Sequence, residues 1–266
     1  MAFDPQTKEQ MITVNVKLAS SEWQLETIMS VPKGPIVLKE MLPLVQSFAD
    51  AVVGSATKTA EQRGEKISCK KGCGACCRQP VPISETEAHL IRDLVERLPH
   101  SRQTEIRDRF AQARQRLAEA GLLEKLLHPE SWDKGEGWAV AMSYFRLGIP
   151  CPFLENEACS IHPDRPLKCR EYLVTSPAEN CRRPTADNIN MVALPFQMWV
   201  AIARLDSASA GERRIPWVPL VLALEWAELH TETAEPRPGQ EILKQFFELL
   251  SSKNRSQEQD ALNESC

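Results

Sequence analysis

The chain has 266 residues, of which 42% are hydrophobic and 26% charged, and its formal net charge at pH 7 is −4. A chain of this length and composition can bury one sizeable core, alone or with an appendage, and is typical of a globular protein. Its mildly acidic balance argues against general nucleic-acid binding. The longest apolar stretch, residues 191–205, is shorter than the roughly 20 residues that span a bilayer, and the first ten residues do not resemble a signal peptide. We therefore expect a cytoplasmic protein with neither nucleic acid nor a membrane as its partner.

The first predicted element is a short β segment within residues 1–34. The run ITVNVKL alternates apolar and polar residues, which is the pattern of a strand, and Gly34 is a breaker that ends the segment. Beyond Gly34, apolar residues recur at steps of three and four over residues 36–62. This spacing predicts one long helix that contains Pro43 and delivers the chain to Cys69.

Two further helices are predicted after the first cysteines. Ser84 and Glu87 form the S-x-x-E pattern of a capping box, and the helix that they begin is stopped by Pro99. Ser101 can cap the next helix, and Gly121 is a natural end for it. The arginines of that helix alternate with acidic residues, so we expect its outer face to be solvated rather than a binding patch.

The second half of the chain is predicted to contain a hairpin followed by helices. Residues 151–163 hold two short apolar pieces around a turn at 155–157, as in a hairpin-like loop. Helical spacing is then found at 190–205, 217–230 and 239–250, and we expect the large aromatic residues there to lie in the core.

These elements predict a mainly α fold with a short N-terminal β element and irregular metal-binding cysteine loops. We expect a β segment at 1–34, a helical cysteine-cluster metal-binding domain at 35–250, and a disordered tail at 251–266. The tail is polar, so it can bury little surface to offset the entropy cost of ordering it.

The chemistry of the chain is concentrated in its cysteines, of which there are nine. Cytosolic thiols are kept reduced, so clustered cysteines there are more often metal ligands or redox groups than disulfides. Their spacing matches neither a helix nor a strand, which argues against ordinary buried cysteines. Cys266 stands alone, and the other eight form two sets of four: Cys69, Cys73, Cys76 and Cys77, then Cys151, Cys159, Cys169 and Cys181.

Two sets of four thiols give the number of ligands that a metal centre in a protein requires. Thiolates are soft donors that suit Zn²⁺ and iron–sulfur clusters, and Gly72 and Gly74 leave room for a tight cysteine-bearing loop. Both cysteine segments are also locally basic in an acidic protein. We expect these cations to lower the pKa of the thiols and to stabilise a negatively charged centre, although any one of them could equally be an ordinary surface residue.

The sequence resembles the YkgJ-type cysteine-cluster family through CKKGCGACC, CPFL, CSIHPDRPLKCREY and the final Cys181. This family is described as a "putative zinc- or iron-chelating domain" with eight characteristic cysteines, and all eight have a match here over residues 65–183. The resemblance implies metal chelation by these cysteines. The family usually has a tyrosine where this chain has His162, so His162 is either an extra nitrogen ligand or a replacement for a packing aromatic.

Two cofactors fit this resemblance. A four-sulfur zinc site would be structural and closed, whereas a [4Fe–4S] cluster could transfer electrons or bind a substrate at an exposed iron. The flagellin lysine methylase carries a similar cysteine pattern with an iron–sulfur cluster, which favours iron, but nothing in this chain shows the activity of that methylase, and a methylase-like enzyme is a less favoured alternative. An iron–sulfur protein of this kind could have a redox or protein-modifying activity on an unknown partner or substrate. The alternative is a zinc-binding adaptor without catalysis.

A less favoured alternative is a radical S-adenosylmethionine enzyme, because Cys69, Cys73 and Cys76 have its CxxxCxxC spacing. Those enzymes continue with alternating strands and helices and place an aromatic residue before the third cysteine. This chain has consecutive helical patterns over 84–130 and Ala75 at that position, which argues against this class on fold-level analogy.

Overall fold

A computed structural model describes residues 11–19, 24–133, 135–185, 187–206, 215–232 and 234–251. Cys266 and the predicted tail after residue 251 therefore lie outside the described residues, as do residues 1–10 of the predicted β segment. No helix in the described ranges combines the length and apolarity that crossing a bilayer requires.

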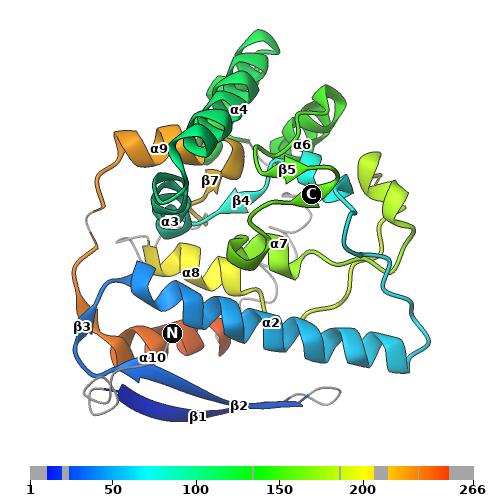
Figure 1. The fold of residues 1–266 in the computed structure, drawn as a ribbon. Helices are drawn as coiled ribbons and strands as arrows, with labels where there is room; N and C mark the ends of the chain where they lie inside the picture. The colour runs from blue at the N-terminus through cyan, green and yellow to red at the C-terminus, as the bar shows by residue number, and fades with distance from the viewer. Residues whose placement is uncertain are drawn as a thin grey trace.

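The predicted N-terminal β element is confirmed as a two-stranded hairpin. Strand β1 (Met11–Ala19) pairs antiparallel with β2 (Gln24–Pro32), in a register that runs from Met11 opposite Pro32 to Ala19 opposite Gln24. Met29 and Val31 are buried on one face of this hairpin. That face packs against helices α2 (Leu38–Gln62) and α10 (Gly239–Ser251), which cover it in Figure 1.

The long predicted helix is confirmed as α2, with Pro43 inside its N-terminal part. The Glu40 carboxylate accepts a hydrogen bond at 2.9 Å from the Val37 backbone N–H, which satisfies one of the donors left free where the helix begins. The apolar residues at steps of three and four bury one face of α2 against α7 (Leu167–Glu171) and α8 (Met198–Asp206). Helix α2 crosses the molecule and ends on the side that holds the cysteine segments (Figure 1).

Helices α3 (Glu85–Glu96) and α4 (His100–Glu119) come after the first cysteine segment. The predicted capping box is confirmed: the Glu87 N–H donates to the Ser84 hydroxyl at 3.2 Å, and the Ser84 N–H donates to the Glu87 carboxylate at 3.0 Å. The prediction that Ser101 caps α4 is wrong, because Pro99 occupies the N-cap and its carbonyl accepts the first backbone hydrogen bonds. Gly121 lies just after the end of α4 with a φ of +69°, as a helix C-terminus requires.

The remaining helices form the upper part of the molecule and are α5 (Leu123–Leu127), α6 (Glu136–Leu147) and α9 (Ala223–Leu229). The short 3₁₀ helices of the described residues are η1 (Ala75–Arg78), η2 (Pro129–Ser131), η3 (His162–Asp164), η4 (Ala178–Arg182) and η5 (Leu220–Leu222). Short antiparallel pairs join distant segments: β3 (Pro35–Ile36) with β8 (Arg237–Pro238), β4 (Pro82–Ile83) with β7 (Val218–Pro219), and β5 (Leu154–Glu155) with β6 (Ala158–Cys159).

Two predicted helices begin later than their apolar spacing indicates. Residues 190–197 are not helical, because backbone hydrogen bonds pair 173–175 with 190–192 and α8 begins only at Met198. Residues 218–219 form strand β7 rather than helix, since they pair with β4. In both places a partner strand that is distant in the sequence overrides the local periodicity.

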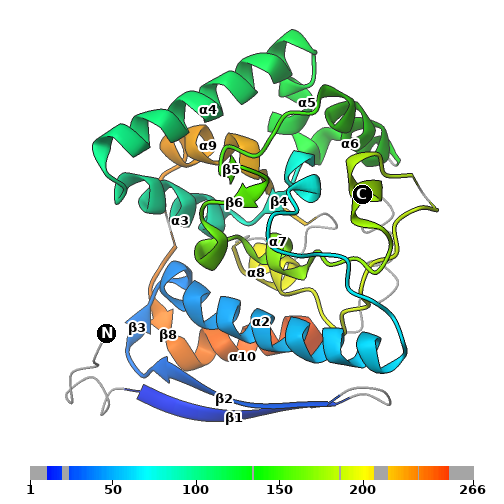
Figure 2. The ribbon, with the colours of Figure 1, turned by 45° about the vertical axis from the view of Figure 1, so that its right-hand side comes forward.

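The two largest clusters of apolar side chains among the described residues are a lower and an upper one. The lower cluster lies between the hairpin, α2, α8 and α10, and includes Trp199 and Phe246, which were predicted to be in the core. The upper cluster joins α3, α4 and α9 to the chain around Phe153. Figure 2 shows the cysteine-bearing segments around η1, η4 and β5–β6 gathered beside α7 on one side of the molecule, between these two layers.

Candidate metal centre

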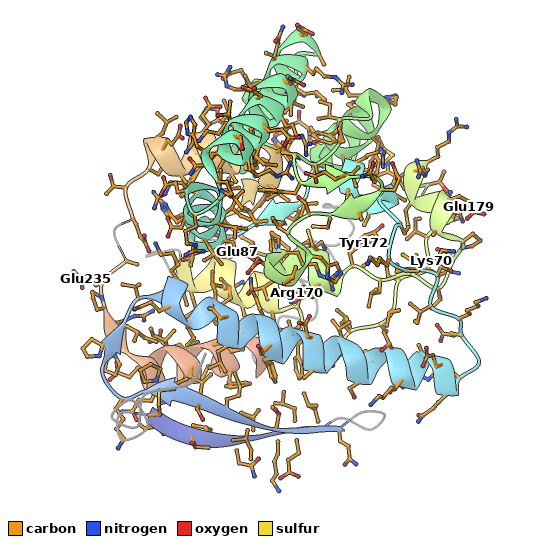
Figure 3. The ribbon with its side chains drawn as sticks, viewed as in Figure 1. Lys70, Glu87, Arg170, Tyr172, Glu179 and Glu235 are labelled. Carbon is orange, nitrogen blue, oxygen red and sulfur yellow. The ribbon has the colours of Figure 1, made fainter. Side chains whose placement is uncertain are left out.

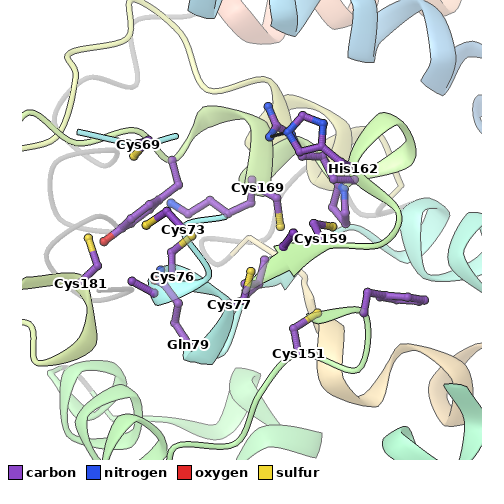
Figure 4. A pocket seen from close by; sticks show the side chains of 18 of the residues that line it. Cys69, Cys73, Cys76, Cys77, Gln79, Cys151, Cys159, His162, Cys169 and Cys181 are labelled. Atoms are coloured by element: carbon purple, nitrogen blue, oxygen red, sulfur yellow. Dashed lines mark hydrogen bonds between the residues drawn. The ribbon is translucent and has the colours of Figure 1, made fainter. Parts of the chain in front are cut away.

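The eight cysteines of the two predicted groups line one pocket, whose volume is about 680 Å³. Figure 4 shows their side chains around this pocket. All eight are free thiols in the structure. Seven of them are half-buried, and Cys181 is buried with 4% of its surface exposed.

The first cysteine segment is held against residues 174–175. The Ser68 N–H donates to the Val174 carbonyl at 2.9 Å, and the Val174 N–H in turn donates to the Cys69 sulfur at 3.4 Å. Gly72 then turns the chain with a φ of +84°, a conformation that favours glycine. The chain next enters η1, which carries the adjacent Cys76 and Cys77.

Gly74 lets this segment approach the second cysteine segment closely. A Cβ atom at Gly74 would lie 2.6 Å from the Leu154 Cδ1 atom and 3.2 Å from the Glu157 Cα atom. Because one of these neighbours is backbone, the clash could not be relieved by a side-chain rotation alone. The glycine predicted to leave room in the cysteine-bearing loop therefore does so against the β5–β6 hairpin.

The second cysteine segment contains the predicted hairpin. Strands β5 and β6 are joined by Asn156 and Glu157, which both have positive φ angles of 49° and 59°. Two left-handed residues in succession are typical of the tight turn that joins twisted antiparallel strands. The hairpin carries Cys159 on β6, and the Cys151 N–H donates to the Cys77 carbonyl at 2.7 Å.

Glu157 ties together three segments that carry cysteines. One of its carboxylate oxygens accepts from Arg78 of η1 at 2.6 Å, and the other accepts from Arg182 of η4 at 2.8 Å. The Arg78 guanidinium also donates to the Gly74 carbonyl at 2.8 Å. The sequence predicted only a turn at Glu157. Its ion pairs could have been expected from the presence of an acidic residue between two basic cysteine segments.

Helix α7 holds Cys169 and is anchored to the helices around it. The Leu167 N–H donates to the buried Glu87 carboxylate of α3 at 2.7 Å. Arg170 forms an ion pair at 2.6 Å with Asp50 of α2, and its guanidinium also donates to the Arg165 carbonyl. Figure 3 shows Glu87 and Arg170 near each other above α2. These contacts fix the short helix that positions Cys169.

The sulfur atoms are not arranged in the order of the sequence. In Figure 4, Cys181 lies on the same side of the pocket as Cys69 and Cys73 of the first sequence group. Cys77 of the first group instead faces the side that holds Cys151, Cys159 and Cys169. The two sequence groups are therefore brought together and mixed in the fold.

Burial is the main influence on most of these thiols. It raises the pKa of Cys69, Cys151, Cys159, Cys169 and Cys181 above the ordinary cysteine value. A hydrogen bond from the Cys76 thiol lowers the pKa of Cys77 below the ordinary cysteine value. The prediction that nearby cations lower the thiol pKa values is therefore wrong for most of the cluster, because desolvation outweighs the attraction of those cations.

Cations nevertheless line the pocket, as the basic composition of both segments predicted. They are Lys70, Lys71, Arg165 and Lys168. Lys168 is buried, with 8% of its surface exposed, and the buried Nε atom of Arg165 has no hydrogen-bond partner. The exposed His162 also lines the pocket, with its Nε2 atom 2.6 Å from the Arg165 guanidinium, so its role as a nitrogen ligand stays a prediction.

The donor set fits a thiophilic metal or cluster, since eight soft sulfurs and several cations face one cavity. Within the described ranges, no three His, Cys, Asp or Glu side chains are already drawn together in a metal-binding geometry. The type and number of the donors and their shared pocket therefore indicate a metal site.

Tyr172 is a residue of the site that the sequence did not predict. Its hydrogen bond to Cys181 lowers the pKa of that thiol and so opposes the effect of burial.

Comparison with protein families gives one match in this region. The family model described as "CxxCxxCC: Putative zinc- or iron-chelating domain" matches residues 68–186. This range contains all eight of the pocket cysteines. Searches of curated proteins and of solved structures find no match to the chain.

Proposed function

Because residues 68–186 match the model of a family described as a zinc- or iron-chelating domain, we propose that this protein binds an iron–sulfur cluster through its pocket cysteines. The observation that carries this proposal is that eight thiols from segments far apart in the sequence face a single pocket of about 680 Å³. The proposed ligands are Cys69, Cys73, Cys76, Cys77, Cys151, Cys159, Cys169 and Cys181.

The size of the pocket favours a polynuclear cluster over a lone zinc ion. Zinc in a four-cysteine site holds its sulfurs at about 2.3 Å and fills little space. A cluster of iron and inorganic sulfide occupies more volume and is held by the same kind of ligand. A cavity of about 680 Å³ could hold such a cluster with space for a further ligand.

The surroundings of the thiols also suit a cluster. A centre with four thiolates is negatively charged, and the Lys168 and Arg165 cations would offset this charge from within the pocket wall. Apolar side chains, among them Phe153 and Leu220, line the same pocket and limit the access of water. Both effects tune a reduction potential in proteins that hold such clusters.

When bound, the cluster would supply electron transfer or an exposed iron to which a substrate can bind. The chain's own residues would hold the cluster, compensate its charge and exclude water. The proposal therefore includes a redox or protein-modifying activity on a partner or substrate that reaches the pocket. A radical S-adenosylmethionine enzyme is disfavoured, because consecutive helices α3 and α4 come after the cysteine motif in place of alternating strands and helices.

The second candidate is a structural zinc protein that acts as an adaptor. It is favoured by the way in which the cysteines tie segments 69–78 and 151–182 to each other, since a closed zinc site contributes its binding energy directly to folding. Such a protein would be colourless and redox-inactive.

Anaerobic purification followed by elemental analysis and a visible absorption spectrum separates these candidates. We expect iron together with acid-labile sulfide, and a broad visible absorption that bleaches when a reductant is added. Stoichiometric zinc without iron, after expression with iron supplied, would overturn the iron–sulfur proposal and support the adaptor. A freshly purified protein that contains neither metal, and that takes up neither on anaerobic reconstitution, would overturn metal binding altogether.

A further inference from the structure

We propose that the pocket cysteines form two separate metal centres whose ligands interleave along the sequence. This inference rests on the proposed function and specifies which thiols act together. The Cys181 centre consists of Cys69, Cys73, Cys76 and Cys181, and the Cys151 centre consists of Cys77, Cys151, Cys159 and Cys169.

The sulfur atoms occupy two sides of the pocket. Figure 4 places Cys181 beside the cysteines of the 69–76 loop, although it is the last of the eight in the sequence. Cys77 faces the sulfurs of the 151–169 segment instead. Helix η1, which carries Cys76 and Cys77, also contacts η4, which carries Cys181.

The apolar surroundings divide the cysteines in the same way. Cys181 belongs to a small apolar cluster with Ala75 and Val174, and Cys69 and Cys73 pack against that cluster. The other set packs against a different and larger cluster around Phe153 and Ile161, which touches Cys151, Cys159 and Cys169. Two distinct parts of the core therefore support the two sets.

Cys76 lies at the boundary between the two sets, because its side chain is hydrogen-bonded to that of Cys77.

The geometry of η1 explains why adjacent cysteines serve different centres. A 3₁₀ helix has about three residues per turn, so consecutive side chains leave it in directions about 120° apart. Cys76 and Cys77 can therefore face different centres while their thiols stay in hydrogen-bond contact. The hydrogen bond from the Cys151 N–H to the Cys77 carbonyl further holds Cys77 next to the second segment.

A closely spaced run of cysteines that serves two clusters is known in other iron–sulfur proteins. In two-cluster ferredoxins, the fourth cysteine of a closely spaced run binds the other cluster. The Cys76–Cys77 peptide link would place the two centres of this protein next to each other in the same way. Adjacent centres are suited to passing electrons between them.

Paired serine variants test the grouping by metal content alone. Cys73→Ser with Cys181→Ser should keep about half of the metal, because both changes fall in one centre. Cys77→Ser with Cys151→Ser should also keep about half. Cys151→Ser with Cys181→Ser should lose nearly all of it, since each centre is damaged. Cys266→Ser, which changes a cysteine outside the described residues, should keep the full amount and serves as the control.

Grouping by sequence order predicts a different result. If each centre used one sequence group, the Cys151/Cys181 pair would keep half of the metal and the Cys77/Cys151 pair would lose nearly all. That result, or equal metal content in all three paired variants, would overturn the interleaving while the proposed function stands. An unmodified protein that holds no metal after reconstitution would overturn both.

A measurement on the unmodified protein guards against variants that do not fold. Metal is removed partially with a chelator, exposed thiols are alkylated, and the modified cysteines are identified by peptide mass spectrometry. We expect molecules that have lost half of their metal to be labelled either on the set Cys69, Cys73, Cys76 and Cys181 or on the set Cys77, Cys151, Cys159 and Cys169. Labelling of Cys181 together with Cys151, while Cys73 and Cys77 stay protected, would contradict the proposal.

Discussion

The backbone N–H of Cys151 donates a hydrogen bond to the carbonyl oxygen of Cys77 at 2.7 Å. This bond joins the two cysteine segments directly at two of the proposed ligands. The Glu157 ion pairs with Arg78 and Arg182 join the same segments a few residues away. The protein scaffold therefore brings the thiols together, and a metal would add its binding energy to contacts that already exist.

Metal removal should destabilise the cysteine segments more than the rest of the fold. The binding free energy of a metal held only by the folded state adds to the free energy of unfolding. We expect the midpoint of thermal unfolding to fall by several degrees after chelation, as measured by calorimetry under anaerobic conditions. Hydrogen exchange should rise in 68–78 and 151–182 but not in the β1–β2 hairpin. An unchanged midpoint in verified metal-free protein would contradict this prediction.

Gly74→Ala should disturb the contact between the two cysteine segments. The added methyl group would meet Leu154 and the Glu157 backbone, and overpacking of this kind costs about 1–3 kcal/mol. We expect a lower free energy of unfolding in denaturant titrations and a lower metal content.

Gly54→Ala is the matched control for Gly74→Ala. Gly54 lies within α2, and a Cβ atom there would meet nothing within 4 Å. Alanine stabilises an exposed helix interior relative to glycine by up to about 1 kcal/mol, so this variant should be unchanged or slightly more stable. Equal effects of the two substitutions would show that the close approach at Gly74 is unimportant.

Glu157→Gln should loosen the contact between η1, the hairpin and η4. The variant loses two ion pairs whose members are partly exposed, so solvent screening limits the expected loss to about 1 kcal/mol. The difference from the unmodified protein should shrink at high salt. Glu26→Gln removes the more exposed pair with Lys17 and is the control, for which we expect no measurable change in unfolding. A Glu157 effect that is insensitive to salt would argue against the ion pairs as its cause.

Asp206 should make stability depend on pH. Burial raises its pKa to about 7 from an ordinary value of 3.8, although both of its oxygens accept hydrogen bonds from Thr86. The nearby carboxylates of Glu85 and Glu87 raise it further. The folded protein then keeps a proton that the unfolded chain releases, so the contribution of Asp206 to the free energy of unfolding falls as pH rises from 3.8 to about 7.

The variant Asp206→Asn isolates this contribution, since asparagine does not titrate. Relative to the unmodified protein, its free energy of unfolding should therefore fall less, or rise more, as pH rises over that interval, by an amount on the order of a few kcal/mol in total. Denaturant titrations of both proteins at matched metal loading measure the difference. Identical slopes in the two proteins would contradict a raised pKa for Asp206.

Local patterns predicted most of the helices and the cysteine pocket. The capping box at Ser84 and Glu87 and the turn at 155–157 depend on residues close in the sequence, and the structure confirms both. Helical spacing at 190–197 and 217–219 misled, because strand partners distant in the sequence outcompete the local preference there. The N-cap of α4 was misplaced by two residues, since Pro99 also fits that position.

The arrangement of the thiols could not be predicted from spacing. In the sequence, the long gap between Cys77 and Cys151 separates the cysteines into two groups. Their division in space depends on the direction in which each side chain leaves η1, and on the return of η4 to that helix. Burial likewise reversed the expected direction of most thiol pKa values, because the depth of a cysteine in the pocket is set by contacts between distant segments.

Thiol titration under anaerobic conditions tests the central claim that all eight pocket cysteines bind metal. If they do, the native, metal-loaded protein should react rapidly at Cys266 alone, while the denatured and demetallated protein should show all nine thiols. Peptide mass spectrometry after alkylation identifies which cysteine has reacted. Rapid reaction of four or more thiols in the native, loaded protein would contradict the account, because it would leave at most a single four-cysteine site.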